Sequence, residues 1–141
     1  MSTQVGIILP NLGASQLLHE VVGKINQTRG PYTVYYEDIY PTYVRIHAPL
    51  MNITESKYFS GRLIATTLSS ADYILSSLQH NELIFYIYDL EWLRGKTDYV
   101  ANQLIYRNPK LKLYTRCKEY AELIKQYTNR DVGICGLGEL M

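Results

Sequence analysis

The chain has few of the residues that build metal sites or disulfide scaffolds. Two of its 141 residues are cysteine and three are histidine. His19, His47 and His80 are dispersed and have no partner at ligand spacing, so we expect no metal site. Two cysteines do not make a disulfide framework, which predicts a reducing, cytoplasmic setting. Cys117 has no adjacent histidine to activate it, and we interpret it as an inert, half-buried thiol.

The sequence also lacks an excess of charge and any long apolar run. Fourteen basic and thirteen acidic residues leave a net charge of +1. Such a balance gives no electrostatic footprint for nonspecific nucleic-acid or membrane binding. No cleavable signal and no apolar stretch of about 18 residues is present, so no membrane partner is expected.

Nucleotide-binding fingerprints are missing as well. The loop 9–15 lies where a dinucleotide-binding turn would be, ahead of a predicted helix, but it has no Gly-x-Gly-x-x-Gly pattern. Asn11, Gly13 and Ser15 could hold a phosphate at the start of that helix. The alternative is a plain tight turn, which often contains a glycine. We therefore expect no bound cofactor.

Tyrosine is abundant, with 14 residues against two phenylalanines. A tyrosine packs an apolar ring and keeps a polar tip, so this bias suits half-buried strand faces, a wet contact surface, or both.

Strand and helix patterns alternate along the chain and predict one three-layer, Rossmann-like α/β domain over residues 1–141, with a mostly parallel sheet of about six strands. The predicted strands are 4–9, 32–36, 62–67, 83–88, 111–114 and 131–135. The predicted helices are 15–27, one capped by Ser69, 98–106 with Val100, Ala101, Leu104 and Ile105 inward, and 117–127. Residues 39–61 are expected to form an irregular connection with a short helix near 54–59.

The central strand, 83–88, ends in a polar loop that contains Asp89, Glu91, Trp92 and Arg94. Ligands bind beyond the carboxyl ends of parallel strands, so this loop is the first candidate site. Asp89 and Glu91 could act as a base or as a metal-assisting pair, or they could belong to a solvated loop. Trp92 and Arg94 could form a stacking platform, although Trp92 could instead pack internally and Arg94 pair with Glu91.

Other strands end in polar residues that would share the same rim in a parallel sheet. These are Glu37 and Asp38 after the second strand, Thr66 and Thr67 after the third, and Arg116 after the fifth. The convergence of these residues on one edge carries the prediction of a ligand crevice there.

Three segments carry a resemblance to a known group of proteins. They are IFYIYDLEWLR (84–94), LYTRCKEYAE (113–122) and NRDVGI (129–134). The chain resembles glycosyltransferase-like proteins of tailed bacteriophages, which are similar to the amino-terminal Rossmann-like half of GT-B glycosyltransferases. The resemblance implies a phage-encoded protein that functions in the host cytoplasm.

One departure from that group limits the expected activity. In the two-domain enzymes the carboxyl-terminal half holds most of the sugar nucleotide, and this chain stops where that half would begin. The resemblance therefore implies a domain that binds a nucleotide sugar or an acceptor and that is incomplete as a stand-alone catalyst. Transfer would require a homodimer or a separately encoded second domain, with Asp89 or Glu91 as base and Arg94 or Arg116 facing phosphate. The alternative is a non-catalytic module that binds a host or virion protein through its tyrosine-rich surface. In that case the protein could itself be associated with the virion.

Overall fold

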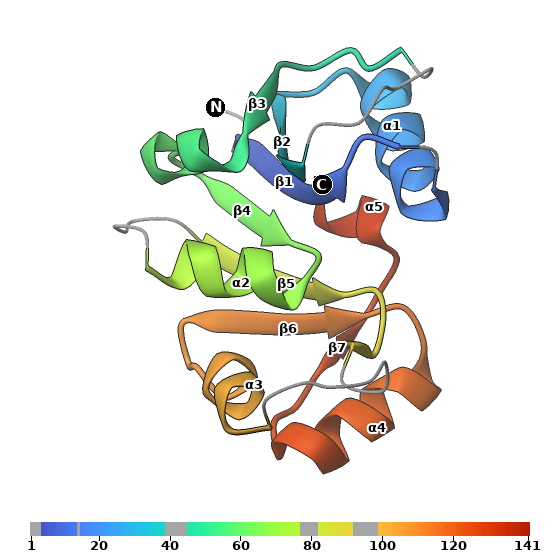
Figure 1. Ribbon diagram of the computed structural model, residues 1–141. Helices are drawn as coiled ribbons and strands as arrows, with labels where there is room; N and C mark the ends of the chain where they lie inside the picture. Colours follow the sequence, from blue (N-terminus) through green and yellow to red (C-terminus); the bar gives the residue numbers. More distant parts are fainter. Residues whose placement is uncertain (1–3, 14, 39–44, 77–81, 92–98) are drawn as a thin grey trace.

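A computed structural model describes residues 4–13, 15–38, 45–76, 82–91 and 99–141 (Figure 1). Its strands are β1 Val5–Asn11, β2 Tyr32–Asp38, β3 Leu50–Asn52, β4 Arg62–Ala65, β5 Glu82–Ile87, β6 Leu111–Thr115 and β7 Gly133–Ile134. Its helices are α1 Gln16–Thr28, the 3-10 helix η1 Ile53–Tyr58, α2 Leu68–Leu75, α3 Tyr99–Tyr106, α4 Lys118–Thr128 and α5 Leu137–Leu140.

The strands form one sheet in the order β3-β2-β1-β4-β5-β6-β7, and every described pairing is parallel. The predicted α/β, Rossmann-like architecture is confirmed. The chain adds β2 and β3 on one side of β1 and then continues with β4 on the other side. The strand order therefore reverses between β1 and β4, and ligands bind at the carboxyl ends of the strands at such a point in open sheets of this kind.

Helices cover both faces of the sheet, as Figure 1 shows. Helices α1 and α5 pack on one face, and α2, α3 and α4 pack on the other. The alternation of side chains along β5 reflects this layering, because Ile84 and Tyr86 point to the α1 side whereas Phe85 and Ile87 point to the α2 side. All four are at most 1% exposed, so the predicted central strand is buried on both faces.

The region 39–61 is more regular than its sequence predicts. Residues 39–44 lie outside the described part, but Leu50–Asn52 form the edge strand β3, and the expected short helix is the 3-10 helix η1. Strand β3 was missed because it has three residues and pairs only with β2. Leu50 and Met51 are 40% and 42% exposed, so no buried face marks the strand in the sequence.

The start of α2 differs from its prediction by two residues. Thr67, not Ser69, is the N-cap, and its hydroxyl oxygen accepts a hydrogen bond from the Ser70 amide at 3.1 Å. The Ser70 hydroxyl oxygen accepts the reciprocal bond from the Thr67 amide at 3.1 Å. Serine here takes the place that glutamate or glutamine has in the usual capping box, which is why the sequence pattern pointed to the wrong residue.

Helix α3 is rotated relative to the prediction from its apolar spacing. Val100 and Leu104 are 66% and 70% exposed, and Ala101 is also exposed. The inward side instead presents Gln103 and Tyr106, with Asn102 also buried. The Tyr106 ring stacks on Phe85 with the ring centroids 5.6 Å apart, and the Gln103 amide donates a 2.6 Å hydrogen bond to the Tyr127 carbonyl. These two contacts give α3 its orientation and leave Val100, Ala101 and Leu104 on the surface. Ile105 alone of the predicted inward residues is partly buried against the core.

Candidate functional site

The loop after β1 closes on itself and starts α1. The Asn11 side-chain oxygen accepts a 2.9 Å hydrogen bond from the Gly13 amide, which makes an Asx turn. The Ser15 hydroxyl oxygen accepts a 3.0 Å hydrogen bond from the Leu18 amide and caps α1. All three predicted loop residues therefore have a local structural role. The first turn of α1 carries no acidic side chain.

Two carboxylates from different strands meet at the start of α2. Glu37, in β2, accepts hydrogen bonds at Oε1 from the hydroxyls of Thr67 at 3.1 Å and Ser69 at 2.7 Å. Glu91, beyond β5, accepts a 2.7 Å hydrogen bond at Oε2 from the Leu68 amide. We refer to this cluster of side chains, Glu37, Thr67, Ser69 and Glu91, as the α2 crevice, after the predicted ligand position at this edge of the sheet. It lies on the side of the sheet that α2 covers, next to the carboxyl end of β4.

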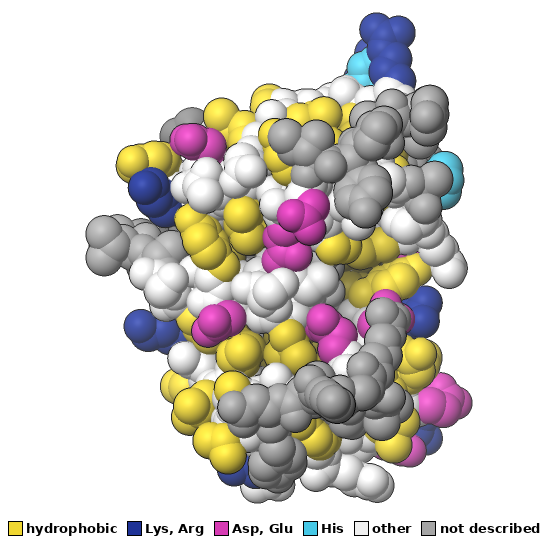
Figure 2. Space-filling model, in the orientation of Figure 1, with side chains coloured by type: hydrophobic (Ala, Val, Ile, Leu, Met, Phe, Trp, Pro, Cys, Tyr) yellow, Lys and Arg dark blue, Asp and Glu magenta, His cyan; other side chains and the backbone are white. Residues whose placement is uncertain are grey.

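The α2 crevice disfavours a phosphate ligand. A helix N-terminus attracts anions, but Glu91 already occupies the first amide of α2 and Glu37 lies beside it. A phosphate would add charge of the same sign next to two carboxylates. Figure 2 shows the same tendency more broadly, with acidic side chains across the middle of this face and most Lys and Arg side chains at its rim. The chemistry favours a neutral ligand with hydroxyl groups.

Arg116 belongs to the opposite side of the sheet. Its guanidinium carbon lies 4.4 Å from the centroid of the Tyr88 ring and 5.2 Å from that of Tyr120. The hydrogen bond with the Tyr120 hydroxyl, at 3.5 Å, raises the pKa of Arg116, and the negative charge of Asp89 contributes further. Burial raises the pKa of Tyr88, and the Glu20 and Asp89 carboxylates add to that effect. Asp89 therefore lies in the field of Arg116, whereas Glu91 is hydrogen-bonded to α2.

The predicted site residues thus divide between two places. Thr67 and Glu91 meet in the α2 crevice, and Arg116 lies with Asp89 on the α1 side. Trp92 and Arg94 lie outside the described residues. Within the described ranges, no group of three or more His, Cys, Asp or Glu side chains could hold a metal ion.

Some contacts of the site residues were not predicted from the sequence. Tyr88 and Tyr120, which hold Arg116, were not predicted. Ser69 was predicted as part of the ligand crevice, within residues 66–69, but not as a partner of Glu37. A signal was available for Tyr120, because positions 116 and 120 are four apart where a helix begins, a spacing that brings side chains together. No such local signal links Ser69 to Glu37, which are 32 residues apart.

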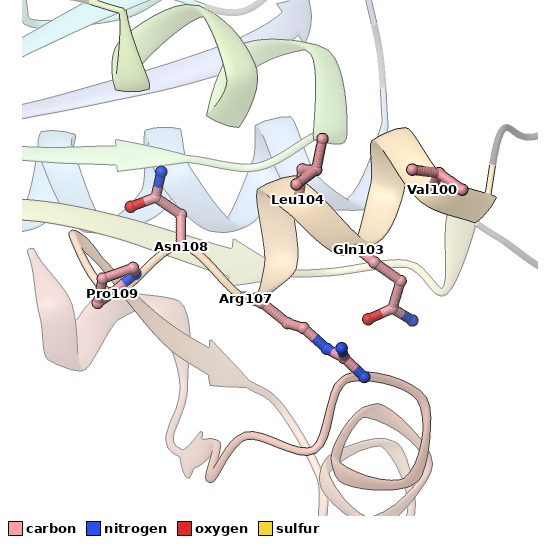
Figure 3. A pocket seen from close by; sticks show the side chains of 6 residues that line it. All are labelled: Val100, Gln103, Leu104, Arg107, Asn108 and Pro109. Atoms are coloured by element: carbon pink, nitrogen blue, oxygen red, sulfur yellow. The ribbon is translucent and has the colours of Figure 1, made fainter.

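A second surface feature lies on α3. A hollow of about 490 Å³ is lined by Val100, Gln103, Leu104, Arg107, Asn108 and Pro109 (Figure 3). Gln103 and Arg107 point toward the end of α4, where Arg107 donates a 3.0 Å hydrogen bond to the Thr128 carbonyl. Val100 and Leu104 point away from α4 and leave an apolar rim.

Comparisons with protein-family models, curated proteins and solved structures find no match to this chain. None of the helices in the described ranges combines the length and apolar character needed to cross a bilayer. The two surfaces described above therefore carry the functional argument.

Proposed function

We propose that the protein is a carbohydrate-binding, glycosyltransferase-like domain of phage origin that holds a sugar acceptor in the α2 crevice. The observation that supports this proposal is the pair of carboxylates, Glu37 and Glu91, fixed at the start of α2 by hydroxyl and amide donors. A carboxylate has about four acceptor sites, so Glu37 keeps capacity for ligand hydroxyls after binding Thr67 and Ser69. A small number of fixed polar groups of this kind gives a ligand pocket its specificity.

Glycosyl transfer also requires a bound nucleotide-sugar donor, which we assign to a partner domain. In that assembly an acceptor hydroxyl attacks the anomeric carbon of a nucleotide sugar, and the bond to the nucleotide phosphate breaks. Glu91, in the α2 crevice, takes the proton of the hydroxyl, and the partner domain supplies the cation that faces the departing phosphate. Glu37 would position the acceptor, because its carboxylate keeps acceptor sites after binding the Thr67 and Ser69 hydroxyls.

Binding of a panel of sugars and nucleotide sugars, followed by thermal shift and donor hydrolysis, tests the proposal. We expect sugars to stabilise the protein and to shift the NMR amide signals of Leu68 and Ser69. Glu37→Gln should weaken sugar binding by about tenfold, since it removes a charged acceptor. Glu119→Gln, on exposed α4, is the matched control and should bind normally. Equal binding by both variants, or no response to any sugar, would contradict the proposal.

A second candidate function is a protein-interaction module, and the observation that favours it is the exposed aliphatic pair on α3. Val100 and Leu104 are four residues apart on one helix face and border the 490 Å³ hollow. An apolar face of this kind suits a homodimer or a host or virion protein. Sedimentation velocity tests the homodimer. Leu104→Glu should dissociate it, whereas Leu123→Glu, on the exposed side of α4, should not. A wild-type monomer at all concentrations would exclude the homodimer.

A further inference from the structure

We propose that a groove between α1 and the turn into α5 binds a small organic phosphate. The groove has a volume of about 440 Å³, which lies in the usual range for small-molecule sites. Its walls include His19, Gly23 and Lys24 of α1, Arg116 after β6, and Gly136 and Gly138 around the start of α5. We call it the α1–α5 groove. It lies on the opposite face of the sheet from the α2 crevice, so the inference does not depend on the proposed function.

The groove gathers basic side chains. Arg116, Lys24 and His19 line it against a single carboxylate, that of Glu20. The whole chain is nearly neutral, with a net charge of +1, so this grouping is local. No ion pair within the described ranges involves Arg116 or Lys24. Lys24 is therefore available to an anion. Arg116 also interacts with the Asp89 carboxylate and the Tyr120 hydroxyl, and its guanidinium presents the fork of donors that matches a phosphate.

Arg116 is already held in place for such a ligand. The rings of Tyr88 and Tyr120 flank its guanidinium at 4.4 and 5.2 Å, so little side-chain freedom remains to be lost on binding. The floor is equally fixed, because Tyr86 is buried and its hydroxyl donates a 2.9 Å hydrogen bond to the Cys135 carbonyl. That bond ties the turn into α5 to the central strand. The groove is thus formed before any ligand arrives.

Two glycines in the groove are not required by packing or by a positive φ, although Gly136 is also the N-cap of α5, where glycine is common. Gly23 lies inside α1, where glycine weakens a helix relative to alanine. A Cβ atom on Gly23 or Gly136 would meet nothing within 4 Å, and neither residue has a positive φ. Packing and backbone conformation therefore do not require glycine at either position. Both keep open a space at the groove wall in which a ligand can approach the backbone closely.

The test uses the full chain and NMR titration with inorganic pyrophosphate, uridine diphosphate and glucose 6-phosphate, with uridine as the control without phosphate. We expect the phosphate-bearing probes to shift the amide signals of Gly23, Gly136 and Gly138, while uridine does not. Responses to uridine diphosphate alone would identify a nucleotide ligand, and responses to glucose 6-phosphate alone a sugar phosphate. Either supports the groove as an organic phosphate site.

Three variants separate this site from a general charge effect. Arg116→Ala should weaken binding of the responding probe by about tenfold or more, and Lys110→Ala, an exposed cation elsewhere, should leave it unchanged. Gly23→Ala should raise the urea midpoint, because alanine favours the helix, and yet weaken binding several-fold because its methyl group fills the groove.

The proposal is overturned if no probe moves the three glycine signals at millimolar concentration, or if probes move only amides of the α2 crevice. It is also overturned if Arg116→Ala or Gly23→Ala binds like the wild-type protein. If Gly23→Ala lowers the urea midpoint, Gly136→Ala is used as the test variant in its place. Binding like that of the wild-type protein would again overturn the proposal. Loss of sugar binding in Glu37→Gln without any change at the glycine signals would affect the proposed function alone.

Discussion

Replacing Arg130 with alanine should destabilise the fold, because the Arg130 side chain binds the carbonyl groups at the carboxyl end of α3. Arg130 follows α4 and donates hydrogen bonds to the carbonyls of Tyr106 at 2.9 Å, Asn108 at 3.0 Å and Leu111 at 2.8 Å. A helix C-terminus leaves such carbonyls without intrahelical partners, and a cation there also complements the helix dipole. Arg130 therefore joins the end of α3 and the start of β6 to the segment after α4.

The size of the effect follows from these contacts. A hydrogen bond from a charged donor contributes about 1.5–3 kcal/mol, but the three bonds share one guanidinium and are not additive. Arg130 is half-buried, so water can reach some of the abandoned carbonyls, and the ordered side chain regains about 2 kcal/mol of entropy. We expect a loss of about 2–3 kcal/mol in the free energy of unfolding. For a chain of this size that corresponds to a fall of roughly 7–10 °C in Tm.

Urea titration monitored by far-UV circular dichroism measures this loss. Arg130→Ala should lower the midpoint without changing the slope, since the surface exposed on unfolding is the same. Arg130→Lys separates geometry from charge, because an ammonium group cannot bridge three carbonyls as the guanidinium does. It should recover less than half of the loss. Lys110→Ala should stay within about 0.5 kcal/mol of wild type. A loss below about 1 kcal/mol for Arg130→Ala, or full recovery by lysine, would refute the reasoning.

Three further substitutions test other parts of the fold. Gly61→Ala should cost at least about 2 kcal/mol, because Gly61 has a φ of +139° and a Cβ there would collide with the Gln4 carbonyl oxygen. Burial would raise the pKa of Glu82, but hydrogen bonds from Lys112 and Arg62 outweigh it and lower the pKa from 4.5. The interaction of ionised Glu82 with Lys112 and Arg62 stabilises the protein above pH 4.5, and this stabilisation is lost as the pH falls and Glu82 is protonated. Glu82→Gln should therefore reduce the acid-induced fall in the free energy of unfolding. Burial raises the pKa of Tyr86 from 10.0 to about 12, which gives stability that is complete below pH 10 and lost toward pH 12. Tyr86→Phe should cost about 1 kcal/mol at pH 7 and flatten that alkaline loss.

Urea midpoints across pH check all three substitutions. Gly136→Ala is the control for Gly61→Ala, since its Cβ meets nothing and its φ is negative. An unchanged midpoint for Gly61→Ala would contradict the strain at that position. A Glu82→Gln profile parallel to wild type below pH 4.5 would contradict the lowered pKa. Tyr73→Phe, at a half-buried position of α2, controls for the other tyrosines at alkaline pH, and equal slopes in both tyrosine variants would contradict the Tyr86 prediction.

The buried strands were the easiest elements to predict from the sequence. The run 83–88 is continuously apolar because β5 has neighbours on both sides and helices on both faces, and the strand lies within one residue of its prediction. Helices α1 and α4 were also placed to within one residue at each end, because the apolar spacing of each is helical.

The elements that the sequence did not reveal depend on contacts between distant residues. Strand β3 forms because it pairs with β2, and its own residues show no alternation of buried and exposed positions. The inward side of α3 is set by the Phe85 ring and the Tyr127 carbonyl, which override its aliphatic spacing. The candidate site follows the same rule. The convergence of strand ends at one edge was predicted, but which side of the sheet each residue joins depends on pairs such as Glu37 with Ser69, and no local pattern encodes those pairs.

Helix α5 would couple ligand binding in the proposed phosphate site to the stability of one half of the core. Leu137 and Leu140 are buried against the α1 face, and Arg62 anchors the Leu140 carbonyl at 2.9 Å. The same four-residue helix supplies a wall of the α1–α5 groove. A molecule seated there would add its binding free energy to the closure of the hydrophobic layer beneath it. Amide hydrogen exchange in α1 and α5 would then slow as the ligand concentration rises, while the exchange rates of the amides in α2 would stay unchanged.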